Sequence, residues 1–192
     1  MIVTPLLVGI HTVEKTDGGT RLPLHTGAVT MIESDGRRIL VDTGARGYFS
    51  DVVHALEDRQ LTVADIDTLI LTHFHLDHAF NVAEFRGSRV IGWMHEWKDK
   101  ETRRLPVVEG FEVIPGVTLL QTPGHAEEHL SVLVEQDGKK IVIAGDAINE
   151  GYMRTGEISA FFYDERLYRN SADRLLALAD EIIPGHGPAF KV

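Results

Sequence analysis

Four side chains of types that bind metal ions lie within six residues: His73, His75, Asp77 and His78. They follow residues 68–72, a short apolar run typical of a buried strand. On an extended backbone, side chains two residues apart point the same way, so His73 and His75 can reach one ion together. If the chain then turns into a helix, Asp77 and His78 face a second ion. A solvated polar loop is the alternative, but burying such a cluster without metal is costly.

Three further candidate ligands each end a strand-like run and directly follow a glycine: His125, Asp146 and His186. Glycine lacks a Cβ, so the backbone can pack tightly around a metal centre at these points. The seven candidates divide into two sets and a bridging residue: His73, His75 and His125; Asp77, His78 and His186; and Asp146 between the sets. Each ion would then have protein ligands and room for a shared water or hydroxide, as catalytic sites do.

The order and spacing of these motifs resemble the metallo-β-lactamase superfamily. The matching motifs are HxHxDH at 73–78, PGH at 123–125, GD at 145–146 and PGHG at 184–187, preceded by VDTG at 41–44. The resemblance runs from about residue 28 to the C-terminus. It implies an α/β fold, the αββα sandwich, with metal ions at the edge between the two sheets. It also implies that Asp42 is a carboxylate beside the site and not a ligand.

Finer features indicate which members of the superfamily the chain resembles. With no cysteine and with Asp146 in the bridging position, it looks like the glyoxalase II, lactonase and ribonuclease Z side. The tail at 184–192, the Asp42 motif and residues 77–81 are similar to the small metallo-β-lactamase domain-containing protein 1 group. His75 stands where flavodiiron proteins carry Glu, which disfavours that redox branch. Many glyoxalase II and lactonase sequences have glycines at 79–80, where this chain has Ala and Phe, so the substrate stays open.

Residues outside the ligand set are candidates for supporting roles. Tyr152 or His95 would donate a hydrogen bond to developing negative charge, although an ordinary structural position is the alternative for both. His129, four residues after His125, stands where related sequences often carry a second histidine and is expected to contact a ligand from behind. The remaining histidines have no partner motif and are interpreted as surface or core residues: His11, His25 and His54.

The elements that must position these residues form a mixed α/β pattern. Asp-Gly between β-prone runs predicts two hairpins, and apolar runs predict buried strands. The hairpins join 29–32 to 38–41 and 130–135 to 140–144, and the buried strands are 68–72 and 117–120. Amphipathic patterns predict helices over 51–60, with Ser50 as N-cap, and over 164–180. Residues 98–104 are rich in charge and are expected to form a solvated loop.

Composition narrows the class of protein. The chain has 192 residues, a formal charge of −10 and 43% hydrophobic residues, so we expect one globular domain over residues 1–192. Without cysteine, disulfides and thiolate sites are excluded. No apolar run reaches the roughly 18 residues that span a bilayer, and no secretory signal is recognisable, so we expect a cytoplasmic location without membrane contact. The acidity disfavours, without excluding, a nucleic-acid partner.

These observations predict a hydrolase that cleaves an ester-like bond with a hydroxide bridging two divalent ions. Zinc suits the nitrogen and oxygen ligands, as do iron and manganese. Asp77 would orient the nucleophile and pass its proton to the leaving group. The substrate would be a small carboxylic ester, thioester, lactone or phosphodiester, and a homodimer is possible. The alternatives are a mononuclear iron sulfur dioxygenase, a small nuclease acting on RNA, as in the animal member of the resembled group, and a non-catalytic metal-binding module.

Overall fold

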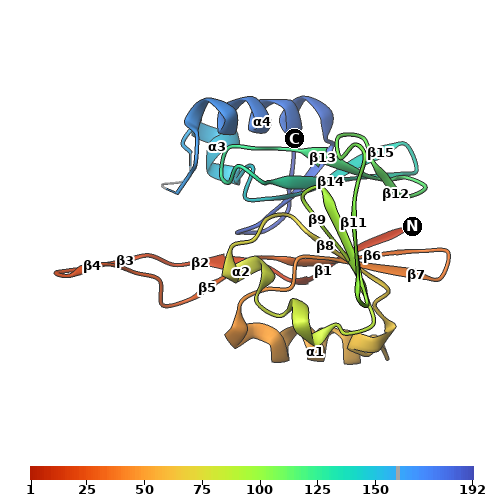
Figure 1. The fold of residues 1–192 in the computed structure, drawn as a ribbon. Coiled ribbons are helices and arrows are strands. Elements are labelled where there is room, and N and C mark those ends of the chain that lie inside the picture. Colours follow the sequence, from red (N-terminus) through yellow and green to blue (C-terminus); the bar gives the residue numbers. More distant parts are fainter. Residues whose placement is uncertain (159–160) are drawn as a thin grey trace.

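The computed structural model describes residues 1–158 and 161–192. Figure 1 shows four layers: helix α1 below a first sheet, a second sheet above it, and helices α3 and α4 on top. The expected αββα sandwich is therefore confirmed. Within the described part of the chain, no helix is both long and apolar enough to cross a membrane.

The first sheet has seven strands in the order β1-β6-β7-β8-β9-β10-β11. It is antiparallel except where β8 pairs in parallel with β7 and β9. The strands are β1 (Ile2–Leu7), β6 (Val29–Ser34), β7 (Arg37–Val41), β8 (Thr68–Leu71), β9 (Arg89–Gly92), β10 (His95–Lys98) and β11 (Glu101–Arg104). Parallel pairing places the ends of β7 and β8 at one edge of the sheet, where their following loops carry the candidate site residues.

The second sheet has six strands in sequence order, with β15 and β16 parallel and the other pairs antiparallel. The strands are β12 (Glu112–Ile114), β13 (Val117–Gln121), β14 (Leu130–Gln136), β15 (Lys139–Gly145), β16 (Glu181–Pro184) and β17 (Phe190–Lys191). The ends of β15 and β16 reach the same edge of the sandwich as the end of β8.

The helices are α1 (Phe49–Glu57), α2 (Leu76–Ala79), α3 (Glu150–Thr155) and α4 (Glu165–Leu178), with 3-10 turns at Arg46–Tyr48, Val63–Asp65 and Val82–Glu84. Helix α4 begins where expected, because the Asp164 side chain accepts a hydrogen bond from Leu167 N–H. The expected cap at Ser50 is wrong. The 3-10 turn continues directly into α1, whose N-cap is Tyr48 with no side-chain hydrogen bond.

Alternating strand residues divide between three apolar cores. On β6, Ile32 faces the core between the sheets while Met31 packs with α1. On β13, Leu119 faces the same central core while Leu120 packs with α4. The central core holds the two sheets together and the outer cores hold the helices on them, which fixes the edge where the strand ends meet.

Both predicted hairpins form, with β6 joined to β7 and β14 to β15. The expected charged loop at 98–104 is wrong, because this segment belongs to a further hairpin of β10 and β11. Asp99 takes the positive φ that a tight turn needs, and Arg103 lies opposite Glu96 and forms an ion pair with it. The charges therefore pair across the strands.

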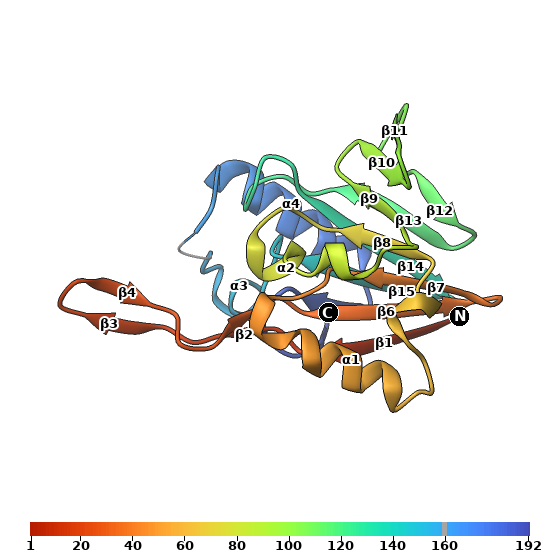
Figure 2. The same ribbon diagram turned by 60° about the horizontal axis from the view of Figure 1, so that its bottom comes forward.

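The N-terminal region adds two small ribbons outside the main sheets. Strand β2 (Ile10–His11) pairs with β5 (His25–Thr26), and β3 (Glu14–Thr16) pairs with β4 (Gly19–Arg21). Figures 1 and 2 both show β3 and β4 projecting away from the body of the molecule, while β2 and β5 lie against it. The β2–β5 pair reaches the edge where the ends of β8, β15 and β16 meet.

Candidate metal centre

All seven candidate ligands come together at this edge of the sandwich. His73 and His75 follow β8, and Asp77 and His78 lie in the short helix α2. The other three come from the second sheet, in the loops after β13, β15 and β16: His125, Asp146 and His186. Each group of ligands is thus held at the end of a buried strand.

Three imidazoles form the tri-histidine set, defined as His73, His75 and His125. Nδ1 of His75 lies 3.0 Å from Nε2 of His73 and 2.9 Å from Nε2 of His125. Two nitrogens bound tetrahedrally to one zinc ion are about 3.3 Å apart, given Zn–N distances of about 2.05 Å. The observed spacing is close to this value, so the three nitrogens are arranged as ligands of a single ion.

Three other side chains form the mixed set, defined as Asp77, His78 and His186. Oδ2 of Asp77 lies 3.4 Å from Nε2 of His78 and 3.3 Å from Nε2 of His186. Asp146 lies between the two sets: its Oδ1 is 3.3 Å from Nε2 of His78, and its Oδ2 is 3.3 Å from Nε2 of His125. Oδ2 of Asp146 also lies 3.5 Å from Nε2 of His186, so Oδ1 faces the mixed set and Oδ2 lies between the two sets.

Three buried atoms in this cluster have no hydrogen-bond partner among the described residues: Nε2 of His78, Oδ1 of Asp146 and Nδ1 of His186. Leaving such an atom unpaired costs about 1–3 kcal/mol. A cation between Nε2 of His78 and Oδ1 of Asp146 would satisfy those two atoms. Imidazole nitrogens and carboxylate oxygens together suit zinc, iron or manganese. The residues therefore fit metal ions by geometry and by chemistry.

Asp42 contacts the ligands from behind. Its Oδ2 accepts a hydrogen bond from Nδ1–H of His78 at 2.8 Å, and both its oxygens accept from Thr72, from N–H and from the hydroxyl, each at 2.7 Å. Since the Thr72 hydroxyl donates to Asp42, it accepts from Nδ1–H of His73 at 3.0 Å. Both ligand histidines are therefore held as the tautomer whose Nε2 lone pair faces the site.

Similar contacts hold the second-sheet side. Nδ1–H of His125 donates to the carbonyl of Phe161 at 2.8 Å, which leaves its Nε2 for the site. His129 is completely buried, and its Nε2 accepts from the backbone N–H of Asp146 at 3.2 Å. Its ring also stacks on His73, with the ring centroids 4.9 Å apart. His129 therefore lies behind the ligands, as the sequence suggests.

The tri-histidine set is built to be neutral. Burial lowers the pKa of His73 well below its usual value, and the neighbouring charges of His78 and His129 act in the same direction. Burial also lowers the pKa of His125, despite the opposing charge of Asp146. Imidazoles with a lowered pKa have free lone pairs near neutral pH, which is the form that binds metal.

The mixed set carries paired charges instead. Burial opposes protonation of His186, but contacts with Asp146 and Asp77 raise its pKa to about 9. Against the same opposition from burial, Asp146 and Asp42 raise the pKa of His78 well above its usual value. Burial raises the pKa of Asp77, but His186 and His78 outweigh it and lower that pKa to about 2. Without metal, this set is an ion-pair network.

Glycines before two of the ligands are required by close approach. A Cβ at Gly185 would lie 2.0 Å from Oδ1 of Asp146, and a Cβ at Gly124 would lie 2.2 Å from the backbone of Tyr168. Gly124 also has a φ of +140°, a conformation that favours glycine. The PGH motifs thus let the loops pack directly against the cluster and helix α4.

The structure does not bring Tyr152 and His95 into the cluster. The Tyr152 hydroxyl donates to Asp173 of α4 at 2.8 Å. His95 lies on β10 with its ring beside Trp97, at a centroid distance of 5.6 Å. Neither residue belongs to the described lining of the cavity at the metal centre.

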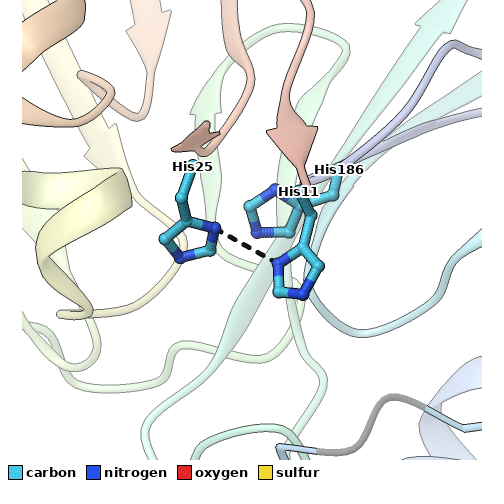
Figure 3. A group of neighbouring side chains, drawn as sticks. All are labelled: His11, His25 and His186. Atoms are coloured by element: carbon cyan, nitrogen blue, oxygen red, sulfur yellow. Dashed lines mark hydrogen bonds between the residues drawn. The ribbon is translucent and has the colours of Figure 1, made fainter. Parts of the chain in front are cut away.

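Two histidines that the sequence analysis assigned to the surface or core lie at the site instead. His11 on β2 and His25 on β5 line the same cavity as His186, and Figure 3 shows the three rings facing one another. The signal that could have found them is the turn at Asp17-Gly18-Gly19: a hairpin centred on Gly18 pairs residue 11 with residue 25, as observed. His54 is exposed on α1.

A cavity of about 210 Å³ opens above the ligands, with Leu22 and Phe161 in its wall. A neighbouring hollow is lined by the aromatic residues Phe161, Phe162 and Tyr163 beside His75 and His125. Among the described residues that line these two spaces there is no Lys or Arg. The site thus presents metal ligands at its floor and apolar groups in its walls.

With this geometry in place, comparisons with known proteins identify the family. A profile described as "Metallo-beta-lactamase superfamily" matches residues 22–186. The chain belongs to this superfamily. Superfamily members are mostly hydrolases. The matched range includes all seven candidate ligands.

Individual relatives support the assignment. The chain is 30% identical to metallo-beta-lactamase domain-containing protein 1 of Xenopus laevis and 32% identical to that of Homo sapiens. Both matches cover 86% of this chain, and they cover 72% and 64% of those proteins. An N-acyl homoserine lactonase of Bacillus cereus is 28% identical over 76% of this chain and 73% of its own length. A putative metallo-beta-lactamase of Thermotoga maritima, 22% identical, has a TM-score of 0.75, covering 99% of this chain and 98% of that one, and so shares the fold.

Proposed function

We propose that the chain hydrolyses an ester-like bond with two divalent metal ions held by the seven ligands. One observation carries the proposal: two sets of ligand atoms at metal-binding spacing are joined by Asp146. Its Oδ1 faces His78 of the mixed set, and its Oδ2 lies 3.3 Å from Nε2 of His125 and 3.5 Å from Nε2 of His186. Superfamily membership and the lactonase relative support hydrolysis.

The residues divide the work between them. The tri-histidine set would hold one ion, the mixed set the other, and Asp146 would bridge them. Divalent ions held this way lower the pKa of a water molecule toward neutrality and polarise the oxygen of the bond to be cleaved. Asp77, ionised at neutral pH, would orient the attacking water and accept its proton at Oδ2 for transfer to the leaving oxygen. Asp42 and His129 hold the ligands in place.

The walls of the site favour a small, largely apolar substrate. A lining without Lys or Arg, in a chain of formal charge −10, attracts polyanions poorly. Leu22 and the aromatic group of Phe161, Phe162 and Tyr163 suit an acyl chain or a lactone ring. A carboxylic ester or lactone therefore fits better than RNA.

The test is a metal count on the purified protein together with a panel of ester, thioester, lactone and phosphodiester substrates. We expect about two zinc, iron or manganese ions per chain, and hydrolysis that a chelator removes and added metal restores. One iron per chain with oxygen consumption would instead indicate a sulfur dioxygenase, and cleavage of RNA alone would indicate a nuclease. A protein unable to take up metal would contradict the proposal.

A further inference from the structure

Three imidazoles meet in the cavity wall: His11 on β2, His25 on β5 and His186 in the loop after β16 (Figure 3). Nδ1 of His11 lies 3.2 Å from Nδ1 of His25. On its other side, Nε2 of His25 lies 3.2 Å from Oδ2 of Asp77. The His25 ring also stacks on His186, with the centroids 5.1 Å apart. His11, His25 and Asp77 of the mixed set thus form a continuous row of hydrogen-bonding side chains.

These contacts determine where the hydrogens lie. The ionised Asp77 carboxylate can only accept, so Nε2 of His25 carries the hydrogen that faces it. In the neutral ring, Nδ1 of His25 is then an acceptor, and Nδ1 of His11 must be the donor. Nε2 of His11 then carries a lone pair, to which none of the described residues donates a hydrogen bond. A hydrogen bond between two Nδ1 atoms needs one donor and one acceptor, so the two rings cannot both carry a hydrogen at Nδ1.

We infer that Asp77, His25 and His11 form a fixed hydrogen-bond relay whose free end, Nε2 of His11, accepts a hydrogen bond from the substrate. This rests on the proposed function and names its substrate class: an ester or lactone with an N–H or O–H group next to the bond that is cleaved. His11 lines the cavity, and in Figure 3 its second nitrogen points away from the other two rings. His11 and His25 are positioning residues, since the ligands perform the chemistry.

A third metal ion held by the same three histidines is the competing interpretation. Nε2 of His186 lies 3.3 Å from Asp77 and 3.5 Å from Asp146, within the mixed set. A neutral imidazole has a single lone pair, so if Nε2 of His186 binds an ion of the mixed set, its Nδ1 carries the hydrogen and cannot bind another ion. Since that lone pair faces the mixed set, only His11 and His25 would remain for a third ion, and the relay accounts for both of them.

Nitrogen-15 NMR of the histidine side chains in the zinc-loaded protein tests the relay without any substrate. We expect His11 as the Nδ1–H tautomer and His25 as the Nε2–H tautomer, and we expect His25→Phe to release His11 from its fixed form. His54→Phe, on the exposed face of α1, is the control. The opposite tautomer at His11, or a third zinc ion that His11→Phe removes, would overturn the relay.

Two substrates of nearly equal size test the substrate class: α-hydroxy-γ-butyrolactone, which can donate a hydrogen bond, and α-methyl-γ-butyrolactone, which cannot. We expect His11→Phe to raise KM for the hydroxy lactone roughly tenfold, the effect of one lost hydrogen bond. The effect is read as the ratio of kcat/KM for the hydroxy lactone to kcat/KM for the methyl lactone, variant against wild type, so that any change common to both substrates cancels. Equal effects on the two lactones, or no effect, would overturn the substrate class.

The same measurements separate this inference from the proposed function. If the wild-type protein cleaves other esters but neither lactone, the proposed substrate class is wrong, while the proposed metal-dependent hydrolysis still holds. A protein that hydrolyses nothing contradicts the proposed function, whereas its histidine tautomers still decide the relay.

Discussion

The tri-histidine set and the mixed set lie on either side of Asp146, yet they meet a cation in different electrostatic states. In the first, burial lowers the pKa of His73 and His125, so the nitrogens are neutral and free. In the second, His186 has its pKa raised to about 9 because two carboxylates outweigh burial. His73 and His125 can therefore bind a cation directly, whereas the mixed set must first release the protons on its histidines.

This difference follows from the composition of the two sets. Burial disfavours the charged form of His73 and His125, and the charges of neighbouring histidines act in the same direction, so the pKa of both is lowered. An imidazole beside carboxylates holds its proton as half of an ion pair, and metal binding there exchanges one cation for another. The ion pairs therefore hold the mixed set in place without metal, but protons compete with metal for its imidazole nitrogen atoms. The tri-histidine set avoids that competition near neutral pH but has no internal ion pairs.

The largest expected effect comes from His75→Ala, which removes the central nitrogen of the tri-histidine set. His75 is an exposed side chain whose Nδ1 contacts both other members, so its loss should remove that ion without unfolding the chain. Loss of a residue behind a ligand typically costs 10–100-fold in metal affinity or activity, and we expect this loss to exceed roughly a hundredfold. Metal analysis and turnover of the best substrate measure it. His54→Ala is the matched control, and activity equal to wild type in H75A would refute the ligand assignment.

Next in size is the pH dependence of metal binding. Below about pH 9 a proton on His186 competes with metal in the mixed set, so its apparent affinity should rise roughly tenfold per pH unit for each proton displaced. His73 and His125, with pKa values below the usual 6.5, should make the affinity of the tri-histidine set nearly flat above that pH. Zinc titrations of His75→Ala and His186→Ala between pH 6.5 and 9 isolate the two slopes. Equal slopes would remove the distinction drawn between the sets.

The stability of the metal-free chain should depend on pH through the same charged groups. The pKa of His186 is higher in the folded chain than in the unfolded chain. Protonation of His186 therefore contributes its full stability below the pKa of the unfolded chain, and this stability is lost as the pH rises through about 9. The pKa of Asp77 is lowered to about 2 in the folded chain. The stability that its charged form contributes is therefore present above the pKa of the unfolded chain and is lost as the pH falls toward 2. Denaturant unfolding of chelated protein should therefore show falling stability at both ends of this range.

Asp42→Asn should have a smaller effect, directed at the mixed set. Asp42 has a φ of +60°, and asparagine tolerates this conformation, so the backbone should be kept. The amide offers one oxygen where the carboxylate uses two, and the hydrogen bond to His78 or one to Thr72 must weaken. We expect a 10–100-fold loss of zinc affinity in a competition titration. Asp51→Asn on exposed α1 is the control, and wild-type affinity in D42N would show that His78 is positioned by other contacts.

The sequence predicted which side chains gather at the candidate site because each follows the end of a strand, where local pattern and position in space coincide. Residues 68–72 read as a buried strand and β8 is one, so His73 and His75 were correctly placed on one side of it. Asp146 and His186 follow β15 and β16, whose parallel pairing brings their ends together. The ligand geometry follows from the sandwich, and the sandwich follows from the alternation of apolar residues.

His11 and His25 were missed for a physical reason. Their strands β2 and β5 have two residues each, too few to show a periodic pattern. Their approach to His186 depends on tertiary packing of the ribbon against the end of β16, including the bridge between Gly9 and Gly187. Sequence spacing could pair the two histidines with each other but not with the metal centre. The sequence therefore predicted the residues at the floor of the cavity, which are the candidate ligands, better than the residues of its wall.

The smallest expected effect is that of Tyr152→Phe, which tests whether the active site extends to helix α3, where Tyr152 lies. The Tyr152 hydroxyl donates to Asp173 at 2.8 Å, so its removal should cost about 1 kcal/mol of unfolding free energy. Because neither set of ligands contacts this hydroxyl among the described residues, metal content and kcat should match wild type. Urea unfolding and steady-state kinetics measure the two quantities. A fall in kcat with unchanged stability would instead make Tyr152 the donor to developing charge that the sequence suggested, and the boundary of the active site would move to include α3.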